Sequence, residues 1–253
     1  MQVDGISALV TGAASGLGAA TAAHLAKHGA SVYGLDLEKA VTVASTVPDG
    51  VTLLAADVTD ETSVREVVAR AADGPGPLRL VVNCAGIAPT GRILSRNGVH
   101  DLELFHTVLK VNLLGTFNVM RLAAGRIATT EADEHGQRGV VVNTASVAAF
   151  EGQIGQIAYT ASKAGVAGMT ITAARDLAQF GIRVCTIAPG IVGTPMLTGL
   201  PEEVQASLAT SVTFPQRLAD PIEYARLVSM IVEHDYLNGE TIRMDGAIRM
   251  SAR

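Results

Sequence analysis

A tyrosine and a lysine stand one helical turn apart at Tyr159 and Lys163, in a chain with only four tyrosines and four lysines. The i, i+4 spacing places both side chains on one face of a helix. An ammonium beside a phenol favours the phenolate, which can exchange a proton with an alcohol or carbonyl oxygen. Ser146, thirteen residues before the tyrosine, can hydrogen-bond the same oxygen. The competing interpretation is a packing tyrosine beside a solvated lysine.

A glycine-rich stretch near the start of the chain, ALVTGAASGLGAA, predicts a nucleotide site. Gly12, Gly16 and Gly18 follow an apolar run and open a helix-like segment, where backbone N–H groups can bind a pyrophosphate. Their spacing differs from G-x-G-x-x-G, and such glycines can be purely structural. Asp36, at the end of the next apolar run, favours the nucleotide site because its carboxylate can bind the adenosine ribose diol. It would repel a 2′-phosphate, so we expect NAD rather than NADP.

Three further polar residues follow or interrupt apolar runs. Asp57 and Asn83 are expected at the carboxyl edge of the same sheet, where ligands bind in open α/β folds. Roles as an N-cap and a turn residue are equal alternatives for these two. Asn112 lies within the apolar run VLKVNLLGTF, and we predict that it holds a water linking Lys163 to solvent.

The elements that must position these residues alternate along the chain. Continuous apolar runs predict seven strands that are covered on both faces, namely ISALVTG, ASVYGLD, VTLLAADVTD, LRLVVNCAG, GVVVNTAS, IRVCTIAPG and ETIRMDGA. Helices are expected over residues 16–28, 63–72, 104–128, 156–180 and 221–233. This pattern predicts one α/β domain over residues 1–253, a Rossmann-type, doubly wound, parallel seven-stranded sheet with helices on both faces.

Composition excludes several classes of partner. The chain has 253 residues, 48% of them hydrophobic, and a net charge of −5, with no long basic cluster, so we expect neither nucleic acid nor a membrane as partner. The first residues lack a signal or transit pattern, and no apolar run could span a bilayer, so a cytoplasmic location is expected. Cys84 and Cys185 lie in apolar runs and are expected to be buried thiols. His24 and His28 lack the further ligands of a metal site.

Motifs of one family follow in order along the chain. They are TGAASGLG at residues 11–18, DV at 57–58, NCAG at 83–86, VN at 111–112, Ser146, YTASK at 159–163 and PGIVGT at 189–194. Together they resemble the short-chain dehydrogenase/reductase family, which usually has NNAG where this chain has NCAG. The resemblance implies a catalytic tetrad of Asn112, Ser146, Tyr159 and Lys163. In it Tyr159 would be the acid/base, with Lys163 tuning its pKa and anchoring the ribose.

The same motifs imply an NAD site along the carboxyl edge of the sheet. The residues expected to contact the cofactor are Gly12, Ser15, Gly16, Leu17, Gly18, Asp36, Asp57, Val58, Asn83, Cys84, Ala85, Gly86, Tyr159, Lys163, Pro189, Val192 and Thr194.

A narrower resemblance lies in SVAAFEGQIGQIAYTASKAG at residues 146–165 and LNGETIRMDGAIRM at 237–250. Both look like the type-2 3-hydroxyacyl-CoA dehydrogenases, also described as 17β-hydroxysteroid dehydrogenases of type 10. The likeness implies reversible NAD-dependent oxidation of short or branched 3-hydroxyacyl-CoA thioesters, a homotetramer, and substrate contacts from Ser146, Gln153 and Tyr159. Val192 stands where animal members have phenylalanine, which is expected to widen the pocket. Chain-length preference and pathway stay open.

Two long segments, residues 88–101 and 188–218, interrupt the alternation and are expected to contact the substrate. We call residues 188–218 the lid. Arg92 and Arg96 in the first segment are candidates for binding CoA phosphates, with a solvated loop as the alternative. The lid has apolar residues that fit an acyl chain or, equally, a core: Met196, Leu197, Leu200, Val204 and Leu208.

Three other functions remain open from the sequence. A 3-oxoacyl-carrier-protein reductase would share the fold and tetrad but usually takes NADPH, which Asp36 disfavours. A dehydrogenase of hydroxysteroids or other secondary alcohols fits the same residues. A non-catalytic NAD-binding scaffold has no need of an intact tetrad.

Overall fold

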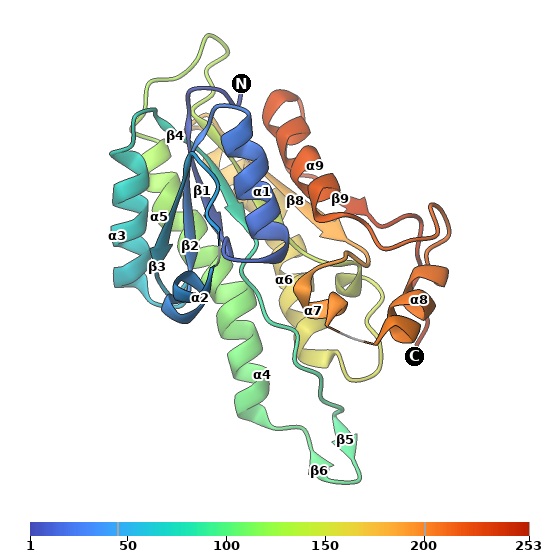
Figure 1. The fold of residues 1–253 in the computed structure, drawn as a ribbon. Coiled ribbons are helices and arrows are strands. Elements are labelled where there is room, and N and C mark those ends of the chain that lie inside the picture. Colours follow the sequence, from blue (N-terminus) through green and yellow to red (C-terminus); the bar gives the residue numbers. More distant parts are fainter. Residues whose placement is uncertain (45, 200, 253) are drawn as a thin grey trace.

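The computed structural model describes residues 1–44, 46–199 and 201–252 (Figure 1). At its centre lies one seven-stranded sheet with all neighbouring strands parallel, in the order β3-β2-β1-β4-β7-β8-β9. The strands are β1 Ser7–Thr11, β2 Ser31–Asp36, β3 Val51–Ala55, β4 Leu78–Asn83, β7 Gly139–Thr144, β8 Ile182–Pro189 and β9 Thr241–Met244. The strand order reverses between β1 and β4, so the predicted doubly wound parallel sheet is confirmed.

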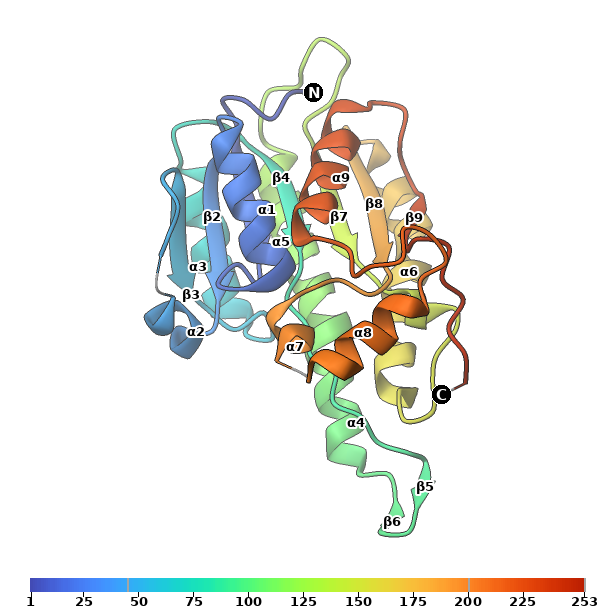
Figure 2. The same ribbon diagram turned by 45° about the vertical axis from the view of Figure 1, so that its right-hand side comes forward.

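Helices cover both faces of the sheet (Figures 1 and 2). Helices α1 Gly16–Lys27 and α9 Pro221–Glu233 lie over one face, where Leu25 and Ile231 share a buried cluster. Helices α3 Glu61–Ala72, α5 Thr116–Ile127 and α6 Ile157–Ala178 lie over the other, where Val67 and Ile127 belong to a second cluster. All residues of β1, β7 and β8 are buried, which explains their continuous rather than alternating apolar sequences.

The helix predicted over residues 104–128 is present over residues 102–127, but it is not α-helical throughout. The segment is α4 Leu102–Leu109, a π-helical turn η1 Lys110–Gly115, and then α5. Asn112 lies in the π-helical turn, fully buried, and its side chain hydrogen-bonds to Ile87 and Ser162. These tertiary bonds favour the wider turn over the regular α-helical ladder, as at many functional sites.

Both segments expected to be irregular contain ordered elements. Residues 88–101 include an antiparallel hairpin of β5 Leu94–Ser95 and β6 Gly98–Val99, which projects away from the body (Figures 1 and 2). The lid contains α7 Pro195–Thr198 and α8 Glu202–Thr210, and a short helix α2 Glu38–Val43 was also not predicted. Such short elements lack the periodicity that identifies a helix or strand.

Of the apolar lid residues predicted to fit an acyl chain or a core, the three whose side chains the structure describes are not buried, namely Leu197, Val204 and Leu208. Helix α8 has no buried residue, and Val204 is exposed. The core interpretation of Val204 and Leu208 is therefore wrong. Leu200 and the side chain of Met196 lie outside what the structure describes. Over the described ranges, no helix is both long and apolar enough to cross a membrane.

Candidate active site

The glycine-rich turn brings β1 and α1 close together at the carboxyl edge of the sheet. A Cβ atom on Gly18 would lie 2.2 Å from the Gly12 carbonyl oxygen, so only glycine permits this approach. Gly12 itself has φ of 67°, and a side chain there would meet the backbone of Ala85 at 3.0 Å. The backbones of the glycine-rich turn and the NCAG turn are therefore in contact, as a shared ligand site requires.

The start of α1 fits a pyrophosphate. Ser15 is the N-cap residue and exposed, and within the described chain its side chain makes no capping hydrogen bond. The first turn of α1 also contains no acidic residue that would repel an anion. The turn thus offers backbone N–H groups and a hydroxyl to a phosphate, with Gly16 lying beside Thr194 of the lid.

Asp36 lies at the end of β2, beside the glycine-rich turn. Its carboxylate accepts hydrogen bonds from the backbone N–H of Ala14, at 2.9 Å, and from that of Leu37, at 2.8 Å. These two bonds fix the orientation of the carboxylate and leave lone pairs on both oxygens for a ribose diol. Together with the start of α1, this geometry fits the adenosine half of a dinucleotide.

The NCAG turn after β4 is held by a residue that the sequence analysis missed. The Thr11 hydroxyl accepts hydrogen bonds from the backbone N–H groups of Cys84 and Ala85, each at 3.0 Å. The sequence signal for Thr11 was its position, since it is a polar residue at the end of an apolar run and directly precedes the glycines. Cys84 is only partly buried, whereas Cys185 is buried as expected, and both are free thiols.

Ser146, Tyr159 and Lys163 converge beyond the end of β7. Ser146 follows β7 and accepts a hydrogen bond from the Ala148 backbone N–H at 3.1 Å, while the other two lie in the first turns of α6. Lys163 is 4% exposed, and its ammonium lies 5.8 Å from the centre of the Tyr159 ring. The Lys163 Nζ donates to the Thr144 carbonyl oxygen at 2.7 Å, a second contact that the sequence did not indicate. The predicted grouping of these three residues is therefore present.

The proton affinities of this group reflect its burial. Burial lowers the pKa of Lys163 from 10.5 to about 8, because the ammonium is removed from water. Burial also raises the pKa of Tyr159, and the hydrogen bond with Ser146 offsets part of that rise. Lys163 alone therefore does not make Tyr159 a base in the cofactor-free protein. A further positive charge is needed, and the nicotinamide ring of NAD⁺ has one.

The Asn112 side chain connects the segment after the NCAG turn to helix α6. Its Oδ1 accepts from the Ile87 N–H at 2.8 Å, and its Nδ2 donates to the Ile87 carbonyl and to the Ser162 hydroxyl. Both amide hydrogens are thus used within the protein. The Oδ1 atom still lies near Lys163, since a Cβ on Gly86 would be 3.2 Å from Oδ1 and 3.6 Å from the Lys163 Nζ. The water predicted between Asn112 and Lys163 stays a prediction.

The other expected cofactor residues lie in several elements around this edge. Val58 is buried, and its carbonyl accepts from Asn118, while the exposed Asp57 accepts from the Thr59 N–H. Pro189 ends β8 and is buried, and Val192 is 5% exposed. The Asn83 side chain, in contrast, points into the interior and donates to Asn143 at 2.9 Å. A cofactor contact through that side chain stays a prediction.

Gln153 lies in the connection between Ser146 and Tyr159. Its side-chain amide donates to the Ser251 carbonyl at 3.3 Å, so the residue is tied to the end of the chain rather than to the catalytic group. Over the described residues, no cluster of three or more potential ligands could hold a metal ion.

Comparison with known proteins shows the family of this chain. The model of the short chain dehydrogenases matches residues 7–205. The chain belongs to this family. As a short-chain dehydrogenase it is 54% identical over 253 residues to 3-hydroxyacyl-CoA dehydrogenase type-2 of Homo sapiens, covering 98% of this chain and 97% of that protein.

Two more comparisons extend the likeness. The short-chain dehydrogenase described here is 35% identical to a 3-oxoacyl-[acyl-carrier-protein] reductase of Thermotoga maritima, over 98% of this chain and 99% of that one. The crystal structure of 3-hydroxyacyl-CoA dehydrogenase type-2 from Mycobacterium avium superimposes with a TM-score of 0.92 at 41% identity, covering 98% of each chain.

Proposed function

We propose that this protein oxidises 3-hydroxyacyl-CoA to 3-oxoacyl-CoA with NAD⁺, reversibly, and favours short or branched acyl chains. The proposal rests on the convergence of Ser146, Tyr159 and Lys163 beside a nucleotide site marked by Asp36. Similarity to proteins named 3-hydroxyacyl-CoA dehydrogenase type-2 supports the substrate. Initial rates with acetoacetyl-CoA should be high with NADH and low with NADPH, and should exceed those with a panel of ketosteroids. Higher rates with the steroids would favour the alternative substrate class.

The chemistry assigns one task to each side chain. NAD⁺, when bound, supplies the hydride acceptor. The Ser146 hydroxyl hydrogen-bonds the substrate oxygen and orients it toward Tyr159. The Tyr159 phenolate takes the proton of the alcohol in oxidation, and the resulting hydroxyl returns it in reduction. The Lys163 ammonium stabilises the phenolate electrostatically and is the expected anchor of the nicotinamide ribose.

The alternative functions make different demands. A reductase of carrier-protein thioesters is supported by the 35% identity to such an enzyme, but the Asp36 carboxylate disfavours the NADPH that it would use. A non-catalytic NAD-binding scaffold needs none of Asn112, Ser146, Tyr159 and Lys163, and all four are in place.

Asp36→Ala is expected to reduce the preference for NAD⁺ over NADP⁺ at least tenfold, since the carboxylate that repels a 2′-phosphate is gone. The measurement is kcat/KM with each cofactor at fixed substrate. Asp49→Ala, which removes an exposed carboxylate outside the expected cofactor contacts, is the matched control and should keep the preference. An unchanged ratio in Asp36→Ala would assign the selectivity to another group.

The hairpin segment offers a place for the CoA part of the substrate. A groove of about 430 Å³ lies between Arg92, Ile93 and Leu94 on one side and the Gln153–Ile157 connection on the other. Arg92 lines this groove, and both Arg92 and Arg96 are exposed. Reversing both charges to Glu is expected to raise the KM of acetoacetyl-CoA about fivefold or more. The KM of the N-acetylcysteamine thioester, which lacks phosphates, should not change, and equal effects on both would remove the arginines from CoA binding.

We also propose a homotetramer, as in the group that the sequence resembles. Support comes from large apolar side chains that are exposed on neighbouring helices, namely Leu114 and Phe117 on η1 and α5, and Ile171 on α6. A second copy of the chain would bury them. The cytoplasmic location stays a prediction.

A further inference from the structure

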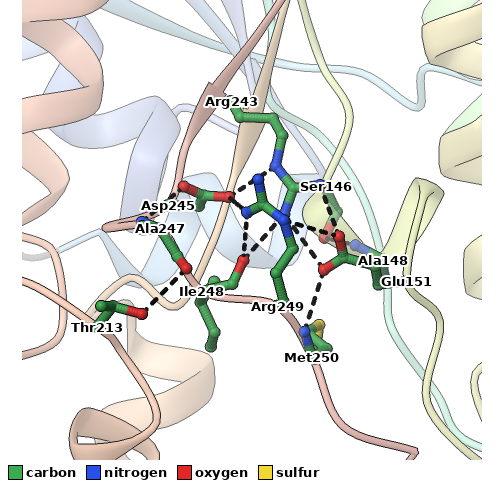
Figure 3. A network of polar contacts seen from close by, with 10 residues as sticks. All are labelled: Ser146, Ala148, Glu151, Thr213, Arg243, Asp245, Ala247, Ile248, Arg249 and Met250. Atoms are coloured by element: carbon green, nitrogen blue, oxygen red, sulfur yellow. Dashed lines mark hydrogen bonds and ion pairs between the residues drawn. The ribbon is translucent and has the colours of Figure 1, made fainter.

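Four charged side chains form a network between the last residues of the chain and the connection from Ser146 to Tyr159, which we call the catalytic loop (Figure 3). Arg243, at β9, donates to Glu151 at 3.0 Å and to Asp245 at 2.7 Å. Arg249 bonds the same two carboxylates, at 3.3 Å to Glu151 and 3.2 Å to Asp245. Each carboxylate is therefore shared by two guanidinium groups, which is a more constrained arrangement than an isolated surface pair.

The loop that this network holds is the connection between Ser146 and Tyr159. Glu151 lies five residues after Ser146, and its Oε2 also accepts the Met250 backbone N–H at 3.1 Å. Two more bonds follow along the loop: Gln153 Nε2 donates to the Ser251 carbonyl, and the Ile154 N–H donates to the Ala252 carbonyl at 3.0 Å. Residues 245–252, which we call the strap, thus contact the part of the loop from Glu151 to Ile154, which includes the expected substrate contact Gln153.

The strap also connects this loop to the lid. Ile248 of the strap is buried in a small apolar cluster with Val147, the residue after Ser146, and Val212 of the lid. The Thr213 hydroxyl of the lid donates to the Ala247 carbonyl of the strap at 3.1 Å (Figure 3). The strap is therefore the piece of chain that the catalytic loop and the lid both contact.

We propose that the strap is a positioning element of the substrate site, and that Glu151, Arg243 and Arg249 set the place of Ser146 and Gln153 without touching the substrate. The proposal rests on the function proposed above, because it presumes that these two residues bind the acyl thioester. The adenosine half of the expected nucleotide site is built from β1, α1 and β2, on the other half of the sheet (Figure 1). Loosening the strap should consequently weaken binding of the substrate and leave that of the cofactor unchanged.

The fold itself should tolerate this loosening. The side chains of Arg243 and Glu151 are 23% and 24% exposed, and that of Arg249 is 63% exposed, so water can replace a lost partner. A purely structural role predicts loss of thermal stability with both Michaelis constants unchanged. A positioning role predicts a change in one Michaelis constant, and the two are thereby separable.

The test is steady-state kinetics of full-length Glu151→Gln and Arg249→Gln with acetoacetyl-CoA and NADH. We expect the KM of acetoacetyl-CoA to rise about fivefold to tenfold in each and kcat to fall because Ser146 is displaced, while the KM of NADH stays within about twofold of wild type. Glu151→Asp, which keeps the charge, should recover part of the loss. Arg65→Gln, which removes an exposed ion pair with Glu61 on α3, is the matched control and should change neither constant.

Two results would overturn the proposal: an unchanged KM of acetoacetyl-CoA in Arg249→Gln, or an equal rise in the KM of both ligands. Arg249→Gln decides the matter if Glu151→Gln fails to fold, because its side chain is largely exposed. Wild-type protein that does not turn over acetoacetyl-CoA contradicts the proposed function instead, which keeps the two failures distinct.

Discussion

Tyr159→Phe is expected to lower kcat about a thousandfold while the affinity for NADH stays within twofold of wild type. The substitution removes one oxygen from a half-buried ring and leaves the packing of α6 intact. The substitution removes the group that is proposed to exchange a proton with the substrate oxygen. An acid/base residue differs from a binding residue in this way, because its loss lowers kcat and leaves the affinity for the cofactor unchanged.

The measurement for Tyr159→Phe is single-turnover reduction of acetoacetyl-CoA beside a fluorescence titration with NADH. Tyr33→Phe, in β2 and partly buried, is the matched control and should retain wild-type turnover. Retention of more than a tenth of wild-type kcat in Tyr159→Phe would remove the residue from proton transfer.

Lys163→Met is expected to lower kcat about a hundredfold or more, because the buried ammonium that stabilises the phenolate is replaced by a neutral side chain of similar length. The substitution should also remove a pH dependence of kcat/KM for NADH that the wild-type lysine causes. The Lys163 pKa of about 8 means that the group is charged below that pH and neutral above it. In wild type, kcat/KM for NADH, which reports the free enzyme, should fall as pH rises through about 8. A fall that persists in Lys163→Met would belong to another group.

The same pKa predicts that this variant is not destabilised. A lysine whose pKa falls from 10.5 to about 8 on folding disfavours the folded state wherever it is charged. That cost is complete below about pH 8 and disappears as pH approaches 10.5. The free energy of unfolding of Lys163→Met in urea at pH 7 should therefore be no lower than that of wild type. Loss of activity without loss of stability would mark Lys163 as a residue retained for function.

The sheet and the nucleotide site could be predicted from the sequence because their signals are local. Continuous apolar runs identified all seven strands, since β1, β7 and β8 are covered on both faces. The predicted helix over residues 221–233 matches α9, whose start is fixed by Asp220 in a capping box. Because Ser146 follows one predicted strand, and Tyr159 and Lys163 lie in the next predicted helix, the sequence also predicted that these three residues lie together.

What the sequence did not indicate depends on contacts between distant segments. The bond from Lys163 to the Thr144 carbonyl has no signal in residue types, because every residue has a carbonyl. The strap joins residues about a hundred positions apart, as in the bond from Met250 to Glu151. The rise of the Tyr159 pKa had no signal in the sequence for a similar reason, since the burial that causes it is a property of the fold.

The π-helical turn η1 shifts the phase of the helix that contains it. Each residue of an α-helix advances by about 100° around the axis. One additional residue in the π-helical turn therefore rotates the side chains of α4 by about that angle relative to those of α5. A helical wheel drawn continuously over residues 102–127 therefore assigns α4 to the wrong side. The exposed Leu102 and the exposed Phe117 must be placed on separate wheels. A homologue lacking one residue of Lys110–Gly115 would keep a long amphipathic helix and lose the inward position of Asn112.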